Sequence, residues 1–137
     1  MNITDNQRKA SILIVDDEEV ICEGLARLFS DRYLTYKARN GREAIDLLRE
    51  HHEIDVVLCD IIMPEMDGTE VVREIRSGNK DIKMIIITAF SSPKKVCEAM
   101  RHGANTFLIK PLDLSVLEMM VRNAVQVKNP SAVSVCN

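Results

Sequence analysis

Four short runs of consecutive apolar residues, rich in valine and isoleucine, constrain the fold of this chain more than any other feature. They are SILIV (11–15), DVVLC (55–59), KMIIIT (83–88) and NTFLI (105–109), and YLTYKA (33–38) is a weaker fifth candidate. Their apolar residues are continuous rather than alternating, which is typical of strands covered on both faces. The pattern therefore predicts a buried parallel sheet.

Between these runs the apolar residues recur with helical spacing. The five stripes are Val20, Ile21, Leu25, Leu28 and Phe29; Ala44, Ile45 and Leu48; Val71, Val72 and Ile75; Val96, Ala99 and Met100; and Leu114, Leu117, Val121, Ala124 and Val125. Parallel strands need crossover connections, and helices supply them. The alternation predicts an α/β fold of three layers, in which a five-stranded parallel sheet carries helices on both faces.

Residues that favour helix ends agree with these positions. They are Ser92-Pro93 as N-cap and first helical residue, Gly103 just past an end, Asn40 with Glu43 as a capping pair, and Asp113 as the cap of the last helix. The helices are therefore predicted both by the spacing of their apolar residues and by the residues at their ends.

The length of 137 residues fits one domain, which we expect at 11–127 after a polar lead at 1–10 and before a flexible tail at 128–137. A net charge of −3 without a long basic run argues against direct nucleic-acid binding. No apolar run approaches membrane-spanning length, and the first ten residues are polar. We therefore expect a cytoplasmic protein without membrane contact, with protein or small-molecule partners.

The four cysteines lie far apart in the sequence, with no C-x-x-C pair. This spacing fits neither a zinc site nor a disulfide framework. Cys22, Cys59 and Cys97 are predicted to be small buried hydrophobic residues, and Cys136 to be a thiol of the tail.

Polar residues follow four of the predicted strands. Asp16 and Asp17 end the first run, Asp60 the run at 55–59, Thr88 the run at 83–88, and Lys110 the last one. In an open parallel sheet, ligands bind outside the carboxyl ends of the strands. These side chains are therefore predicted to share one edge of the sheet.

Three carboxylates at one edge repel one another unless a cation lies among them. A hard divalent ion such as Mg²⁺, or Mn²⁺ in its place, meets that need. A carboxylate beside such an ion can attack a phosphoryl donor and carry an acyl phosphate. Lys110 and Thr88 would supply a cation and a hydroxyl to the phosphoryl oxygens.

Each of these residues also has a simpler interpretation when it is taken alone. Asp17 could be an N-cap followed by first-turn acids. Thr88 could be an ordinary strand-end threonine, Lys110 a solvated lysine and Phe107 a core residue. Their common position at strand ends favours the metal and phosphoryl site.

The segments VDDEE (15–19), LCDIIMPEMDG (58–68), ITAF (87–90) and FLIKP (107–111) together resemble the receiver domain of bacterial two-component response regulators. The resemblance covers roughly residues 10–127, nearly the whole chain. It implies a flavodoxin-like fold with the strand order 2-1-3-4-5.

The resemblance also assigns roles at the predicted site. Asp60 becomes the phosphoacceptor, which takes a phosphoryl group from a sensor histidine kinase or a histidine phosphotransfer protein. Asp16, Asp17 and Asp60, with the backbone carbonyl of Ile62, become the metal ligands. These are the residues that the family uses to hold Mg²⁺.

Three further roles come from the same resemblance. Thr88 becomes the switch hydroxyl, Phe107 the switch aromatic ring that follows it, and Lys110 the lysine that binds the phosphoryl group. Lys110-Pro111 becomes a candidate for a cis peptide bond. The output surface becomes the face of the fourth helix, fifth strand and fifth helix, which would bind a downstream protein or a second copy of the chain.

Two details are particular to this sequence. The resemblance places Ile62 and Phe90, two residues past Asp60 and Thr88, beside the path of attacking water, with the small Ala89 leaving Asp60 accessible. We expect slow loss of phosphate because neither Ile62 nor Phe90 orients water. Met119 and Met120 add apolar residues to the last helix, as a partner surface or as part of a wide buried stripe.

We therefore expect a signalling phosphoacceptor rather than an enzyme that turns over an external substrate. Two alternatives remain. The chain could be the receiver part of a longer DNA-binding transcription regulator. It could also be a small phosphohydrolase that forms an acyl phosphate, although such an enzyme normally needs a second general-acid carboxylate, and Ile62 stands where we would look for one.

Overall fold

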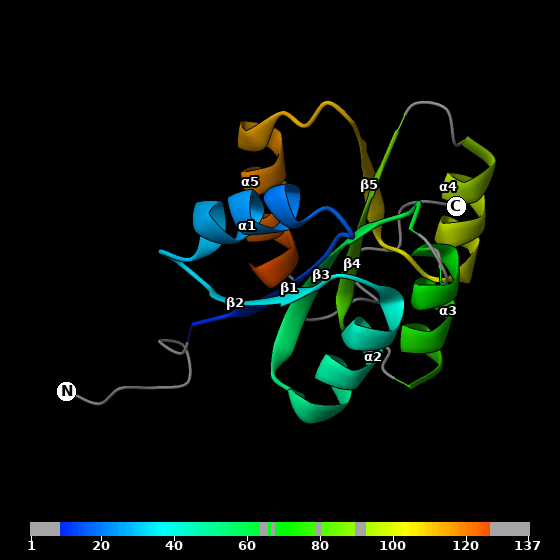
Figure 1. The fold of residues 1–137 in the computed structure, drawn as a ribbon, viewed down its shortest axis with the longest axis horizontal. Coiled ribbons are helices and arrows are strands. Elements are labelled where there is room, and N and C mark those ends of the chain that lie inside the picture. Colours follow the sequence, from blue (N-terminus) through cyan, green and yellow to red (C-terminus); the bar gives the residue numbers. More distant parts are fainter. Residues whose placement is uncertain (1–8, 64–65, 67, 79–80, 90–92, 127–137) are drawn as a thin grey trace.

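The computed structural model describes residues 9–126 except 64–65, 67, 79–80 and 90–92. Strands and helices alternate along the chain (Figure 1). The elements are β1 (Ser11–Val15), α1 (Glu19–Phe29), β2 (Leu34–Ala38), α2 (Gly41–Glu50), β3 (Ile54–Asp60), α3 (Gly68–Gly78), β4 (Lys83–Thr88), α4 (Pro93–His102), β5 (Thr106–Ile109) and α5 (Leu114–Gln126). Each predicted strand is confirmed to within one residue at either end.

The five strands form one parallel sheet in the order β2-β1-β3-β4-β5. Figure 1 shows α1 and α5 on one face of this sheet and α2, α3 and α4 on the other. The predicted three-layer α/β architecture and its strand order are both confirmed. Because β1 and β3 are central, the residues that follow them lie near the middle of the sheet edge.

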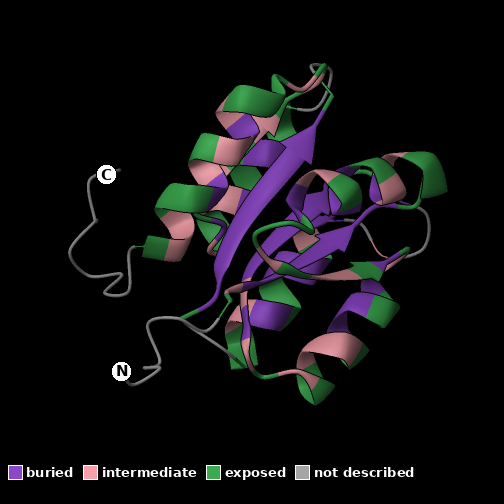
Figure 2. Cartoon of the chain, turned by 90° about the vertical axis from the view of Figure 1, so that its left-hand side faces the viewer, coloured by how far each residue is buried: buried purple, intermediate pink, exposed green. Residues whose placement is uncertain are grey.

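Side chains from alternate positions of the strands enter two separate cores. One core packs β1, β3 and β4 against α1 and α5, and the other packs the opposite face of the sheet against α2, α3 and α4. In Figure 2 the inner strands β1, β3 and β4 are almost continuously buried, whereas the edge strands β2 and β5 are partly exposed and the helices keep exposed outer faces. Burial on both faces explains why the strand sequences are uninterrupted apolar runs.

The residues of the predicted helical stripes are buried or partly buried except at two positions. Val20 is 82% exposed, because it lies two residues, or about 200° of helix, before the buried Cys22. Leu114 is 48% exposed as the first residue of α5, one turn before the buried Leu117. The prediction that these two residues join the buried stripes is wrong.

The helix ends largely follow the predicted chemistry. Asn40 Oδ1 accepts a hydrogen bond from the Glu43 backbone N–H at 2.8 Å. Asp113 Oδ1 accepts bonds from two backbone N–H groups in the first turn of α5, at 3.0 and 3.3 Å. Gly103 follows α4 with a φ of +123°. Pro93 is the first residue of α4, whereas Ser92 lies outside the described residues.

Cys22 and Cys59 are buried as predicted, but Cys97 is exposed. It follows the buried Val96 by one residue, which turns it about 100° away from the core along α4. Cys136 and most of the predicted lead and tail lie outside the described residues, so the domain boundaries stay a prediction. Among the described helices, none is long and apolar enough to cross a membrane.

Candidate functional site

The polar residues at the strand ends meet at the carboxyl edge of the sheet, as predicted. β1 and β3 are paired up to Val15 and Cys59, so Asp16 and Asp60 follow at the same level. β4 continues the edge with Thr88, which pairs with Ile109 just before Lys110. Residues as far apart in the sequence as Asp16 and Lys110 are thereby brought to one place.

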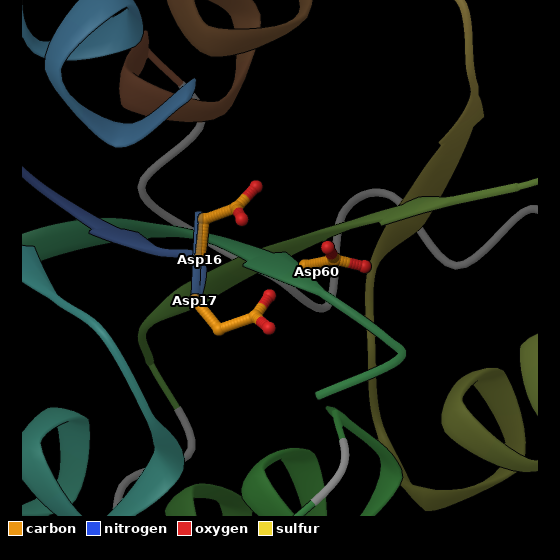
Figure 3. A group of neighbouring side chains, drawn as sticks. All are labelled: Asp16, Asp17 and Asp60. Atoms are coloured by element: carbon orange, nitrogen blue, oxygen red, sulfur yellow. The ribbon is translucent and has the colours of Figure 1, made fainter. Parts of the chain in front are cut away.

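Three carboxylates form the centre of this edge. One oxygen from each of Asp16, Asp17 and Asp60 lies within 4.8 Å of the others. Figure 3 shows Asp16 and Asp17 at the end of β1, next to Asp60 at the end of β3. Asp16 is 1% and Asp60 7% exposed, whereas Asp17 is exposed to solvent. The cluster therefore has a buried side and an open side.

Burial disfavours the charged form of Asp16. Its Oδ1 accepts a hydrogen bond from the Glu18 backbone N–H at 2.9 Å, but its buried Oδ2 has no hydrogen-bond partner. Burial raises the pKa of Asp16 to about 6, with a further contribution from the charge of Asp60. The N-cap of α1 is Glu18, so the N-cap interpretation of Asp17 is wrong.

Asp60 is held by one donor on each carboxylate oxygen. The Ile62 backbone N–H donates to Oδ1 at 3.1 Å, and Lys110 Nζ lies 3.3 Å from Oδ2. The Lys110 backbone N–H donates to the Thr88 carbonyl at 2.8 Å, and the Lys110-Pro111 peptide bond is cis, as predicted. Burial lowers the pKa of Lys110, but the attraction and hydrogen bond of Asp60 outweigh it and raise that pKa overall.

These observations fit a divalent cation. Three carboxylates converge on one another, Lys110 contributes one compensating positive charge, and Asp16 Oδ2 is a buried oxygen without a donor. A cluster of carboxylate oxygens that is open to water on one side suits Mg²⁺ because this ion keeps several of its waters. The role of the Ile62 carbonyl as a further ligand stays a prediction.

Thr88 and Phe107 line the same groove beside α4. The Thr88 side chain is buried, and its Oγ1 donates to the Ala89 carbonyl at 3.0 Å. Phe107 is 40% exposed, so the core interpretation of this residue is wrong. The groove has a volume of about 530 Å³, and its other walls come from α4 and the end of β5. Ala89 is exposed beside Thr88, and Phe90 lies outside the described residues.

Sequence reasoning missed the close approach of Gly68 to the backbone of Asp60. A side chain at Gly68 would place its Cβ 2.8 Å from the Asp60 carbonyl oxygen. The only signal in the sequence is a glycine where the third helix begins, a position at which other residues form helices better.

The chain was compared with known proteins. The family model of the response regulator receiver domain matches residues 12–122. The chain is 41% identical over 119 residues to the regulatory protein AtoC of Escherichia coli, and 41% identical over 118 residues to the transcriptional regulatory protein ZraR of Klebsiella oxytoca. These matches cover 86% and 85% of this chain but 26% of each relative.

A solved structure of a receiver domain protein from Clostridium thermocellum superposes with a TM-score of 0.81 at 30% identity, covering 85% of this chain and 94% of that one. Receiver domains are the signalling phosphoacceptors of two-component systems, and they generally bind Mg²⁺ in an acidic pocket. The match over residues 12–122, together with the acidic edge of the sheet, shows that this chain belongs to the response regulator receiver domain family.

Proposed function

We propose that Asp60 accepts a phosphoryl group from the phosphohistidine of a sensor histidine kinase or a histidine phosphotransfer protein. The observation that carries this proposal is the setting of the Asp60 carboxylate, which lies 3.3 Å from Lys110 Nζ and within 4.8 Å of oxygens of Asp16 and Asp17. A receiver supplied by such a kinase would work in the cytoplasm. Phosphorylation would change its affinity for a partner.

In the transfer, an Asp60 carboxylate oxygen attacks the phosphorus atom. The P–N bond to the donor histidine breaks, and its electron pair returns to the imidazole nitrogen. Asp16, Asp17, Asp60 and the Ile62 carbonyl would hold Mg²⁺, or Mn²⁺, which when bound neutralises charge on the phosphoryl oxygens. Lys110 would give up its contact with Asp60 and bind a phosphoryl oxygen instead.

The switch would begin at Thr88. Its hydroxyl donates to the Ala89 carbonyl, and turning toward a phosphoryl oxygen would break that bond. The movement would open space in the groove that Thr88 shares with Phe107, whose ring is partly exposed. Phe107 would then turn inward and change the surface formed by α4 and β5.

The test is phosphorylation of the wild-type chain by acetyl phosphate with Mg²⁺, followed by intact-mass measurement. We expect one phosphoryl group per chain, no adduct when EDTA replaces Mg²⁺, and a peptide map that places the group on Asp60. A wild-type chain that gains no phosphoryl group under these conditions would overturn the proposal.

We propose that the acyl phosphate is long-lived because the apolar Ile62 side chain, 48% exposed beside Asp60, cannot orient attacking water. Ile62→Asn is expected to shorten the lifetime roughly tenfold, below the usual effect of a positioned proton-transfer group. Phosphate release from the purified phosphorylated domain measures this, with Ile62→Val as the apolar control. Equal lifetimes for Asn and Val at this position would contradict the role of Ile62. The companion prediction for Phe90 falls outside the described residues.

We propose that the output surface comprises α4, β5 and α5. Phe107, Ile109 and Met119 are large apolar residues that are 40%, 43% and 47% exposed on this surface. Met120, in contrast, packs against the core below α5, so only one of the two methionines adds to the surface. The occupant would be a downstream protein or a second copy of the chain.

Sedimentation with and without beryllofluoride distinguishes these occupants. If the second copy is the partner, beryllofluoride shifts the chain from monomer to dimer, and Met119→Gln weakens that dimer. A monomer in both states would exclude the second copy and leave the downstream protein.

The relatives support a second proposal, which concerns what this receiver controls. The chain spans about a quarter of the length of AtoC and ZraR, which are described as regulatory and transcriptional regulatory proteins. We propose that this receiver likewise controls a transcription regulator, within one chain or through a separate partner. We propose no turnover of an external substrate; hydrolysis of a phosphate ester that is lost in Asp60→Asn would favour a phosphohydrolase instead.

A further inference from the structure

Two backbone hydrogen bonds fix Ile61, the residue that follows Asp60. The Ile61 N–H donates to the Ile87 carbonyl at 2.9 Å, at the end of the β3–β4 pairing, where Asp60 pairs with Ile87. The Gly68 N–H donates to the Ile61 carbonyl at 2.7 Å. The first residue of α3 is therefore bound directly to the residue that follows the candidate phosphoacceptor.

Gly68 approaches this backbone more closely than any other residue type could. A Cβ at this position would lie 2.6 Å from Ile61 Cα and 2.8 Å from the Asp60 carbonyl oxygen, whereas real Cβ contacts essentially never fall below 3.0 Å. Both neighbours are backbone atoms of a buried strand end, so they cannot rotate out of the way. A side chain at Gly68 must displace α3, Asp60 or Ile61.

Gly41 makes a second close contact, with the segment that follows Asp60. A Cβ on this first residue of α2 would lie 2.6 Å from Met66 Sδ and 2.7 Å from Val71 Cγ2. Met66 also packs against the core on this face of the sheet. These neighbours are side-chain atoms, so they can move aside more easily than the backbone atoms next to Gly68.

We propose that Gly68 is a positioning residue for phosphoryl transfer: by bringing α3 against the backbone of Asp60 and Ile61, it sets the Asp60 carboxylate and the Ile62 carbonyl relative to Asp16 and Asp17. Gly41 contributes more weakly to the same positioning, through its close approach to Met66. This inference rests on the proposed function of Asp60 and its metal site. Neither glycine touches the reacting atoms.

The test is the Mg²⁺ dissociation constant of folded protein, measured by calorimetry without any phosphodonor. Gly68→Ala is expected to weaken Mg²⁺ binding about tenfold or more, as is usual when the support of a metal ligand is lost, and Gly41→Ala to weaken it less. Gly24→Ala in α1 is the matched control, because no atom lies within 4 Å of its added Cβ. Folding of each variant is checked by urea denaturation, and amide shifts of Ile61 and Ile62 report the displacement.

A folded Gly68→Ala protein that binds Mg²⁺ as tightly as the Gly24→Ala control would overturn the inference. If Gly68→Ala does not fold, Gly41→Ala decides: weaker Mg²⁺ binding supports the inference, and binding equal to the control overturns it. Failure of the proposed function looks different, because the wild type itself would then gain no phosphoryl group.

Discussion

Asp60→Asn is expected to abolish the phosphoryl adduct that acetyl phosphate and Mg²⁺ form on the wild-type chain. The amide keeps the size of the side chain and an oxygen for the Ile62 N–H bond at 3.1 Å, so the edge of the sheet should remain intact. It lacks the anionic oxygen that attacks phosphorus and leaves Lys110 without its ion-pair partner at 3.3 Å. Intact-mass measurement should show the variant unmodified.

Asp55→Asn is the matched control for this experiment. Asp55 lies near the other end of β3, where its carboxylate accepts a hydrogen bond from the Ser11 N–H at 2.9 Å. This variant should gain one phosphoryl group, like the wild type. An adduct on Asp60→Asn, or its loss from Asp55→Asn with the fold intact, would show that phosphate does not reside on Asp60.

Asp16→Asn is expected to stabilise the metal-free domain at neutral pH by about 2–3 kcal/mol in free energy of unfolding. The pKa of Asp16 is raised to about 6 from an ordinary value of 3.8, and each unit is worth about 1.4 kcal/mol. A raised acid pKa means that the folded state holds the proton more tightly than the unfolded state does. The charged carboxylate therefore destabilises the fold. Its side chain is 1% exposed, so solvent screens the effect little.

The pH dependence of this gain follows from the same shift. Well below the ordinary pKa of 3.8, Asp16 is protonated in both states, and the variant should gain little. The gain should grow as the pH rises from about 4 to about 6 and stay constant above that range. Urea denaturation in EDTA at several pH values measures it, with the exposed Asp46→Asn on α2 as the control.

Mg²⁺ should reduce the difference in stability between the two proteins. Held by the native carboxylates as proposed, the ion would stabilise the wild type, whereas Asp16→Asn has lost one of these ligands and should gain less from the ion. A gain in stability that is the same at pH 4 and pH 7, or an equal response to Mg²⁺, would contradict the electrostatic account of Asp16.

The fold was predictable because its signals are local. A strand buried on both faces must be apolar at successive positions, and KMIIIT at 83–88 coincides with β4. The Asn40 and Asp113 caps are likewise contained within one turn of chain. Strand order is different, because no local pattern states that β1 lies between β2 and β3. That order came from resemblance to receiver domains.

Burial of single residues was less predictable. Val20 and Cys97 have the residue types of a core but lie outside the arc of their helices that faces the sheet. The sequence also gave no sign that Arg76 of α3 donates to the Gly103 carbonyl at 2.8 Å and the Ile82 carbonyl at 2.8 Å. These bonds join the end of α3 to the end of α4 and the start of β4.

By itself, the sequence determined that this chain is a parallel α/β domain with acids, a threonine and a lysine after its strands. Each of those facts depends on neighbouring residues and on the rule that parallel strands end at one edge. Only the tertiary structure decided three further features. Asp16 Oδ2 is buried without a donor, and Lys110 contacts Asp60 from fifty residues away in the sequence. Gly68, at the start of α3, packs against the Asp60 backbone. Desolvation and close packing arise between segments that are distant in sequence, so no local pattern records them.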